Sequence, residues 1–296
     1  ARFRLFVLDL GRKGAAPREV FRCDHLDDFS FDWSPDSSTI AVACNRDPRA
    51  LFHPERAEIL LVDPAGKRSP RSIEGLPEGP KDSPRWSPDG THLGWAGRRG
   101  RSSMYDTANV ELWTAAIDGR ASRPRAVRPT SPTGASDFCL MSGTLSDTAD
   151  ASFAPWFAWS PEGQSLLMRI GWHGAGRIAS VSASGGEVVL HTDGGAELAP
   201  GAFAAREGLI VAVRSAPMQP PEIAVAEVHG HLFEVEVRTS FNSSFRQSRA
   251  LVTPREVWVT ADGRIRSGAP RSKGRRSGHA VHAWVMRPPP GAPRRG

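Results

Sequence analysis

The sequence predicts an all-β protein, and three observations support this prediction. A seven-residue phrase built around Trp-Ser-Pro occurs three times, at residues 31–37, 84–90 and 157–163. Glycine and proline are abundant, with 29 and 25 among 296 residues, as loop-rich β proteins require. No helical periodicity continues for more than a few turns. A phrase repeated in this way indicates one supersecondary unit used several times.

Each copy of the phrase predicts a β-hairpin. Proline fixes φ for the second position of a type I turn, and the Asp or Glu and the small residue after it suit the following positions. A strand-forming aromatic residue precedes each turn, and apolar runs follow at residues 40–42, 93–95 and 166–168. The tryptophans that precede the turns are predicted to pack between neighbouring units; they are Trp33, Trp86 and Trp159.

A further strand is expected after each hairpin, at residues 58–63 and 110–118 for the first two copies. The interval from Trp33 to Gly66 is 33 positions, and so is the interval from Trp86 to Gly119. In the third copy the corresponding interval, from Trp159 to Gly185, is 26 positions. A constant core with connections of variable length is typical of a sheet unit with adjustable loops.

A fourth, degenerate copy fits the same frame, with a turn at residues 203–208 and strands at 209–213 and 222–228. Residues 5–11 resemble the closing strand of an earlier unit. Four units of about four strands each, plus this remnant, predict blades of an incomplete β-propeller. A β-sandwich with accidental recurrences is the alternative, and the matched spacing of three near-copies argues against it.

The overall charge and the cysteine content limit the classes of partner and the cellular location that the sequence predicts. The formal charge is +6 and the isoelectric point about 9.9, but the basic residues are scattered, except at 264–276 and 294–295. No aromatic and basic platform for nucleic acid stands out, and no apolar run of 18 residues would span a membrane. An odd number of widely spaced cysteines predicts buried thiols and a cytoplasmic location, although a signal preceding Ala1 stays open; the cysteines are Cys23, Cys44 and Cys139.

No catalytic residue, metal site or cofactor site can be assigned from the sequence, and substrate-binding residues stay unknown. No serine has glycines two positions before and after it, as a hydrolase nucleophile turn requires; Ser102 has Gly100 but then Met104. His229 and His231 flank a predicted turn, so we interpret them as loop residues and not as a metal pair. His279 and His282 lie beside the Gly/Ser/Arg-rich stretch near 266–278 and His173 lies in a glycine-rich connection, and at each of these we favour a satisfied or solvated side chain over a catalytic one. The recurrent acids at strand ends fit turn formation: Asp9, Asp63 and Asp118.

The tail carries a family resemblance. Residues 239–242 (Thr-Ser-Phe-Asn) are followed by residues 254–263, which end in Asp-Gly, and by residues 282–289, which contain Ala-Trp-Val-Met-Arg-Pro. This succession resembles the junction in serine peptidases of the prolyl-oligopeptidase (S9) family, in the acylaminoacyl-peptidase and dipeptidyl-peptidase branch. There a propeller precedes an α/β-hydrolase domain. The hairpin phrase itself is shared with TolB-like and WD40-like propellers, so the tail makes the resemblance more specific.

The resemblance covers essentially the whole chain and implies two regions. Residues 1–238 would form about four blades and a remnant, and residues 239–296 a junction whose two strands lie at 256–263 and 284–288. An insertion near 266–278, rich in Gly, Ser and Arg, predicts a disordered loop. The chain stops at Gly296, where the hydrolase domain is expected to begin, and further blades are expected before Ala1.

The implied function is that of the non-catalytic propeller portion, which limits access of short peptides to a Ser-Asp-His site carried by the parent protein. The alternative is a TolB-like or WD40-like propeller that serves as a protein-interaction module. An independent propeller enzyme would need a cluster of carboxylates or histidines, which the sequence does not indicate. Open blade edges predict self-association into a homo-oligomer.

Overall fold

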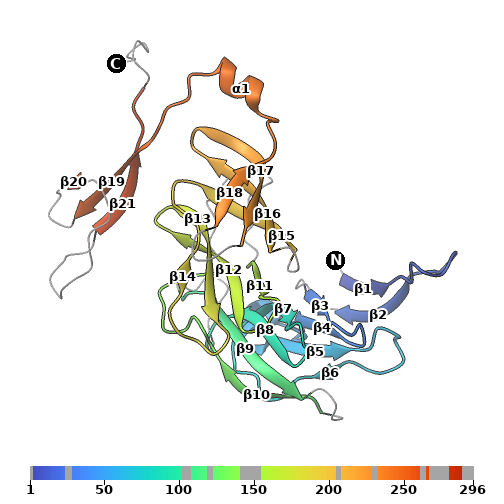
Figure 1. Ribbon diagram of the computed structural model, residues 1–296. Coiled ribbons are helices and arrows are strands. Elements are labelled where there is room, and N and C mark those ends of the chain that lie inside the picture. The colour runs from blue at the N-terminus through green and yellow to red at the C-terminus, as the bar shows by residue number, and fades with distance from the viewer. Residues whose placement is uncertain are drawn as a thin grey trace. The chain divides into compact units, whose positions relative to one another are not determined.

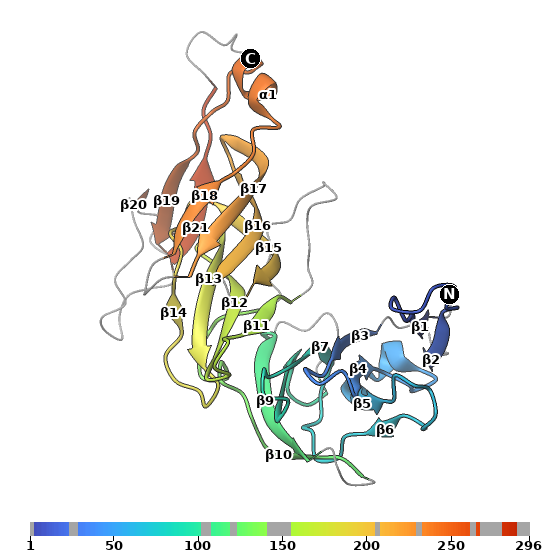
Figure 2. The same ribbon diagram turned by 45° about the vertical axis from the view of Figure 1, so that its right-hand side comes forward.

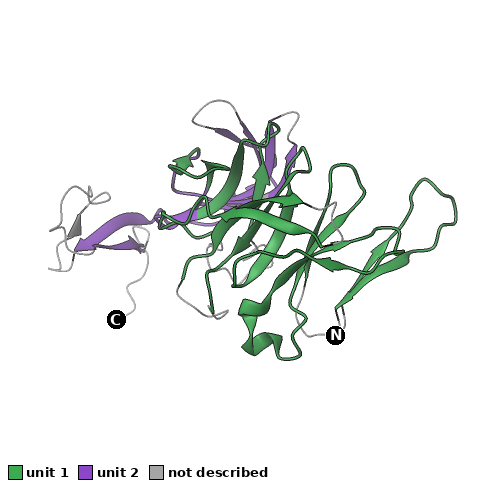
Figure 3. Ribbon diagram, turned by 90° about the horizontal axis from the view of Figure 1, so that it is seen from below, with its two compact units in different colours: residues 1–142, 152–170, 178–191 green, residues 143–151, 171–177, 192–296 purple. Residues whose placement is uncertain are grey.

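The computed structural model describes residues 3–23, 29–101, 108–118, 123–140, 155–204, 208–228, 233–260, 265–266 and 280–288 (Figure 1). Within these ranges the helical elements are short: η1 (Ala50–Phe52), η2 (Pro54–Arg56) and α1 (Ser243–Ser248). Everything else that is regular is strand. The chain divides into two compact units: residues 1–142, 152–170 and 178–191 form unit 1, and residues 143–151, 171–177 and 192–296 form unit 2 (Figure 3).

Four antiparallel sheets of four strands each follow one another along the chain, and we call them blades 1 to 4. Blade 1 contains β3 (Ser30–Trp33), β4 (Ile40–Cys44), β5 (Glu58–Val62) and β6 (Arg71–Ser72). Blade 2 contains β7 (Lys81–Trp86), β8 (His92–Gly97), β9 (Glu111–Asp118) and β10 (Arg125–Thr130). Blade 3 contains β11 (Phe157–Trp159), β12 (Ser165–Trp172), β13 (Ala175–Ser182) and β14 (Val189–Leu190). Blade 4 contains β15 (Glu197–Ala204), β16 (Leu209–Ala216), β17 (Gln219–Glu227) and β18 (Glu234–Val237).

In every blade the strands lie side by side in chain order, which Figures 1 and 2 show for blade 1. This topology confirms the predicted propeller blades and excludes the β-sandwich alternative. The closing strand predicted at residues 5–11 is confirmed only as far as Val7: β1 spans Phe3–Val7 and pairs with β2 (Arg18–Cys23), which was not predicted, to form an N-terminal strand pair. The proposed division of the chain at residue 238 is not tested by the two compact units and stays a prediction.

The turns at Ser-Pro-Asp, or Ser-Pro-Glu in the third copy, have the predicted structure in all three copies. Each tryptophan pairs with the first apolar residue of the next strand: Trp33 with Ile40, Trp86 with Leu93 and Trp159 with Leu166. The residue after the acid adopts a left-handed conformation, with φ of +59° at Ser37, +68° at Gly90 and +69° at Gly163. Glycine adopts this conformation without steric cost, whereas Ser37 does not.

Neighbouring turns also lie against each other. A methyl group added at Gly90 would lie 3.6 Å from Cδ of Pro35, and one added at Gly163 would lie 3.6 Å from Cδ of Pro88. Both distances are ordinary van der Waals contacts, so it is the positive φ and not the space that favours glycine. The turn of each of these blades therefore rests on the proline of the preceding one.

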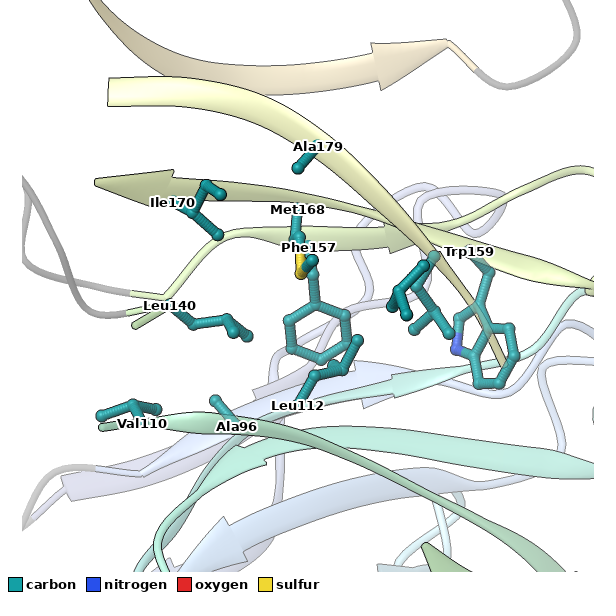
Figure 4. Close-up of a cluster of buried hydrophobic side chains, with 11 residues drawn as sticks. Ala96, Val110, Leu112, Leu140, Phe157, Trp159, Met168, Ile170 and Ala179 are labelled. Atoms are coloured by element: carbon teal, nitrogen blue, oxygen red, sulfur yellow. The ribbon is translucent and has the colours of Figure 1, made fainter. Parts of the chain in front are cut away.

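Apolar side chains fill the space between consecutive blades. Between blades 2 and 3, Ala96, Val110 and Leu112 face Phe157 and Trp159 (Figure 4). A second cluster joins blades 1 and 2, and a third joins the N-terminal strand pair to blade 1. The core of unit 1 thus lies between its sheets, as the blade architecture requires.

The three repeated tryptophans differ in their surroundings. Trp159 is 6% exposed, and its Nε1 donates a hydrogen bond of 3.0 Å to the carbonyl oxygen of Arg85 in blade 2. Trp86 is half-buried against the cluster between blades 1 and 2. Trp33, in contrast, is 39% exposed. The prediction of inter-blade packing is confirmed for Trp159 and Trp86 and is wrong for Trp33, which belongs to none of the apolar clusters between the sheets.

After blade 4, unit 2 continues with α1 and a three-stranded C-terminal sheet of spatial order β20-β19-β21. Its strands are β19 (Arg255–Thr260), β20 (Ile265–Arg266) and β21 (Ala280–Val285). The strand predicted at 284–288 therefore begins at Ala280 and ends at Val285, before the prolines. Arg266, expected in the insertion, belongs to β20, and residues 267–279 lie outside the described residues.

Candidate functional site

A cavity of about 510 Å³ lies in unit 1, where the turns of blades 1 and 2 meet. Both turn carboxylates, Asp36 and Asp89, line it together with the indole of Trp86. Apolar residues of the blades complete the wall, namely Leu61 and Ile117. The Nε1 atom of Trp86 is buried and has no hydrogen-bond partner among the described residues.

Hydrogen bonds within each turn hold the two carboxylates. Asp36 accepts bonds from the hydroxyl of Ser34 at 2.6 Å and from the amide and hydroxyl of Ser38 at 3.0 and 2.8 Å. Asp89 is held in the same way by Ser87 and Thr91. These bonds lower the pKa of each carboxyl to about 2, with the bond from the preceding serine as the largest cause. The cavity therefore carries two carboxylates. Because their oxygens accept hydrogen bonds from the turns, we interpret these carboxylates as structural groups.

A cluster of aromatic rings and histidines lies in unit 2, on one face of the C-terminal sheet. In β21 the residues His282 and Trp284 alternate, and in β19 Trp258 lies opposite His282. The rings of Trp258 and His282 stack at 4.5 Å, and those of His282 and Trp284 meet edge-on at 5.2 Å. Nε2 of His282 lies 3.1 Å from Oε1 of Glu256, which also accepts a 3.0 Å hydrogen bond from Trp258.

The connection between β12 and β13 completes this cluster. His173, with φ of +51°, stacks on Trp172 at 4.4 Å and meets Trp258 edge-on at 4.8 Å. Gly174 follows with φ of +69°, and an added Cβ would lie 2.9 Å from Nε1 of Trp284. Glycine is therefore required here for two reasons, the backbone conformation and the close approach of an indole ring.

The surroundings of His173 lower its pKa. Burial lowers the pKa of His173 first, and the positive charge of Arg177 and the neighbouring His282 lower it further, while Glu256 opposes them. A carboxylate and an imidazole in contact supply two members of a hydrolytic triad. Here the pair is packed among indole rings, and the sequence has no nucleophile turn of the Gly-X-Ser-X-Gly form. We therefore assign the cluster a packing role.

The segment at 239–242, on which the family resemblance partly depends, has a defined structural role. Glu222 of β17 is 4% exposed and accepts hydrogen bonds from the hydroxyl of Thr239, from the amide of Phe241 at 3.0 Å and from the amide of Asn242 at 2.8 Å. These bonds lower the pKa of Glu222, and the bond from Thr239 is the largest cause. The carboxylate thus fixes the chain where it leaves the last blade strand.

The other residues singled out in the sequence behave as turn or loop residues where the structure describes them. Asp9 accepts a bond from the amide of Gly11 at 3.0 Å. Asp63 accepts bonds from three amides, the nearest at 2.8 Å. Asp118 is exposed at the end of β9. His229, His231 and His279 lie outside the described residues.

Among the residues that the structure places, no group of three or more His, Cys, Asp and Glu side chains is arranged to hold a metal ion. None of the helices described has the length and apolar character needed to cross a bilayer. The sequence interpretation of His173 and His282 as satisfied or solvated side chains did not include their proximity to each other, with ring centroids 6.1 Å apart. The sequence does contain a signal for this cluster. Glu256 and Trp258 are two residues apart, as are His282 and Trp284, and alternate residues of a strand lie on the same face of a sheet.

No protein-family model matches the sequence, and no curated protein matches it either. Among solved structures, the orthorhombic form of Pyrococcus horikoshii acylaminoacyl peptidase has a TM-score of 0.56 at 13% identity, over 92% of this chain and 34% of the peptidase. Its uncomplexed form gives 0.54 at 12% identity, over 90% and 34%. TolB from Acinetobacter baumannii gives 0.49 at 19% identity, over 87% and 53%.

The chain thus spans about a third of that peptidase and about half of that TolB. Residues 239–296 make up about a fifth of the chain, so a match that covers 92% of it extends beyond the blades into the C-terminal segment. At these identities the likeness concerns the fold alone. The chain therefore has a β-propeller fold that is similar to part of these acylaminoacyl peptidase structures.

Proposed function

We propose that this chain is the propeller portion of an S9-type serine peptidase and limits the access of short peptides to an active site that another part of the parent protein supplies. The observation that carries the proposal is the order of elements. Four blades are followed by a carboxylate-fixed segment and then by the separate C-terminal sheet. A propeller used only for interactions has no evident need for this continuation.

Two further findings support the proposal. The peptidase whose fold this chain shares is named for the removal of acylated amino acids, and the match extends into the segment after blade 4. The structure also explains why that segment contains Thr239 and Asn242, because the hydroxyl of Thr239 and the side-chain amide of Asn242 both donate hydrogen bonds to the buried Glu222. The segment 239–242 therefore has a structural role, because its hydrogen bonds to Glu222 hold the chain in place directly after blade 4. Short peptides are the partners that this function implies.

The first test addresses the chemistry. The reading frame downstream of Gly296 is examined for a Gly-X-Ser-X-Gly turn, and the complete polypeptide is labelled with a fluorophosphonate probe, with the present chain as the control. Labelling of the complete polypeptide alone supports the proposal. A folded complete polypeptide that does not react would refute it and leave the interaction module as the function.

The second test addresses the gating. Hydrolysis of a short peptide is compared with hydrolysis of a long unfolded chain that carries the same cleavage site. We expect a large preference for the short peptide in the intact enzyme. Loosening the propeller with Trp159→Ala, which removes a contact between blades, should raise hydrolysis of the long chain more than that of the short one. Equal changes for both substrates would argue against gating.

A further inference from the structure

A hollow of about 350 Å³ lies in unit 2, at the end of the C-terminal sheet where β19 begins and β21 ends. It is lined by the segment that leads into β19 and by the end of β21 with the residues that follow it. Leu251, Val252 and Val285 supply apolar surface, and Arg255 and Arg287 supply charge. We call this feature the C-terminal hollow.

The strand register shows which face of the sheet borders the C-terminal hollow. Arg255, the first residue of β19, pairs with Val285, the last residue of β21, and both line the hollow. The adjacent pair, Glu256 and Trp284, belongs to the ring cluster, and successive residues of a strand point to opposite faces. The hollow and the ring cluster therefore lie on opposite faces of the same two strands.

Two guanidinium groups border the C-terminal hollow without a counter-ion. Among the residues that the structure describes, no ion pair or side-chain hydrogen bond is made by Arg255 or Arg287. The nearest carboxylate in sequence, Glu256, is engaged on the other face, where its Oε1 lies 3.1 Å from Nε2 of His282. Since two positive charges beside one hollow repel each other, an anion placed between them would be stabilised by both.

The simpler interpretation is that both residues are ordinary solvated surface arginines. The chain has 38 Lys and Arg against 32 Asp and Glu, so some basic side chains must lack a partner. Arg246, which is exposed on α1 and does not line the hollow, fits that interpretation. It does not explain why Arg255 and Arg287, which come from different segments, border the same apolar hollow.

We propose that the C-terminal hollow binds a small amphipathic anion. Its acidic group, a carboxylate or a phosphate, is held between the guanidinium groups of Arg255 and Arg287. Its short apolar chain lies on Leu251, Val252 and Val285. Guanidinium groups bind both acids through pairs of parallel N–H bonds, and each methylene removed from water adds to the affinity. The volume of the hollow is within the range of small-molecule sites.

This inference is independent of the proposed peptidase role, because it concerns ligand binding by the chain itself and not hydrolysis. The test titrates the full chain of 296 residues by isothermal calorimetry with octanoate and with octyl phosphate. The controls are octylamine and octanol, which have the same apolar chain without the negative charge, and acetate, which has the carboxylate without the chain.

We expect the octyl anions to bind with a dissociation constant on the order of 0.1 mM, and the three controls to bind at least about tenfold more weakly. Whichever anion binds more tightly identifies the acidic group. In the native chain, saturation should also shift the Nε–H nuclear magnetic resonance signals of Arg255 and Arg287. Octanol or octylamine binding as tightly as octanoate, or no saturable binding of either anion up to about 5 mM, would overturn the proposal.

Matched variants locate the binding. Arg255→Gln and Arg287→Gln should each weaken binding of the preferred anion by about tenfold or more, because each removes a charge-assisted hydrogen bond. Arg246→Gln removes the same charge outside the hollow and should leave the affinity unchanged. Native affinity in either hollow variant, or equal weakening in all three, would show that the anion binds elsewhere. All three arginines are exposed, and the signals of the native chain do not depend on the folding of any variant.

Discussion

Replacing each repeated tryptophan with phenylalanine gives a sharp test of how the blades are held together, because one sequence position is sampled in three environments. Phenylalanine keeps the aromatic ring against the sheet and removes two ring carbons and the indole N–H. We expect Trp159→Phe to lower the free energy of unfolding by about 2–3 kcal/mol. About 1.6 kcal/mol comes from two buried carbons and about 1 kcal/mol from the lost hydrogen bond to Arg85.

The same change should cost much less at the other two positions. Nε1 of Trp86 is buried without a partner among the described residues, so removing it also removes a desolvation penalty of about 1–3 kcal/mol that offsets the lost packing. Trp33 is 39% exposed and loses little burial. We therefore expect Trp86→Phe and Trp33→Phe to change the free energy of unfolding by about 1 kcal/mol or less.

The assay is urea unfolding followed by far-UV circular dichroism, which does not depend on tryptophan emission. For Trp159→Phe the midpoint should fall by roughly 1 M, given a urea dependence of about 2–3 kcal/mol/M. The other two variants serve as internal controls. Equal costs at the three positions, or the greatest cost at Trp33, would refute the argument that the hydrogen bond and the burial between blades decide the energy.

Three further predictions concern turns, histidine and the blade exit. Ser37→Gly should raise the free energy of unfolding by about 0.5–1 kcal/mol, because glycine adopts the left-handed backbone conformation of this position without strain. Gly163→Ala should lower the free energy of unfolding by about 1 kcal/mol for the converse reason. Urea titrations measure both changes, and changes of the opposite sign would contradict the turn assignment. His173 has a lowered pKa in the folded protein, so the unfolded chain binds its proton first as the pH falls. The stability that neutral His173 contributes is therefore complete above about pH 6.5 and is lost as the pH falls from that value through the pKa of the folded protein. His173→Phe should make the free energy of unfolding less dependent on pH in this range, as urea titrations at several pH values would show. Glu222→Gln should speed hydrogen exchange of the Asn242 amide while leaving that of β8 unchanged; equal exchange in the variant would show that the carboxylate does not fix this segment.

The blade architecture was predictable because the determinants of the turn are local. The Pro35 ring, the Asp36 carboxylate and the serines around them form a hairpin through contacts within six residues, and these contacts appear directly in the sequence. The outermost strands were not predictable in the same way. Strands β6 and β14 are two residues long, and pairing with a neighbouring strand, not their own composition, defines them.

Features that depend on distant contacts escaped the sequence. The hairpin phrase does not encode which of its tryptophans is covered, and Trp33 is 39% exposed. The ring cluster joins the tip at His173 to strands almost a hundred residues away, so the sequence around His173 did not indicate the rings on which it packs.

The contact between successive turns has an evolutionary consequence. The proline of one copy of the phrase lies next to the glycine of the following copy: Pro35 lies next to Gly90, and Pro88 lies next to Gly163. A tandem duplication of the unit would therefore carry both halves of a new interface with it, and the added copy would find a fitting neighbour before any further substitution occurred. Chains built on this phrase can gain or lose blades by recombination at low structural cost, so blade number is expected to vary more readily than the turn itself.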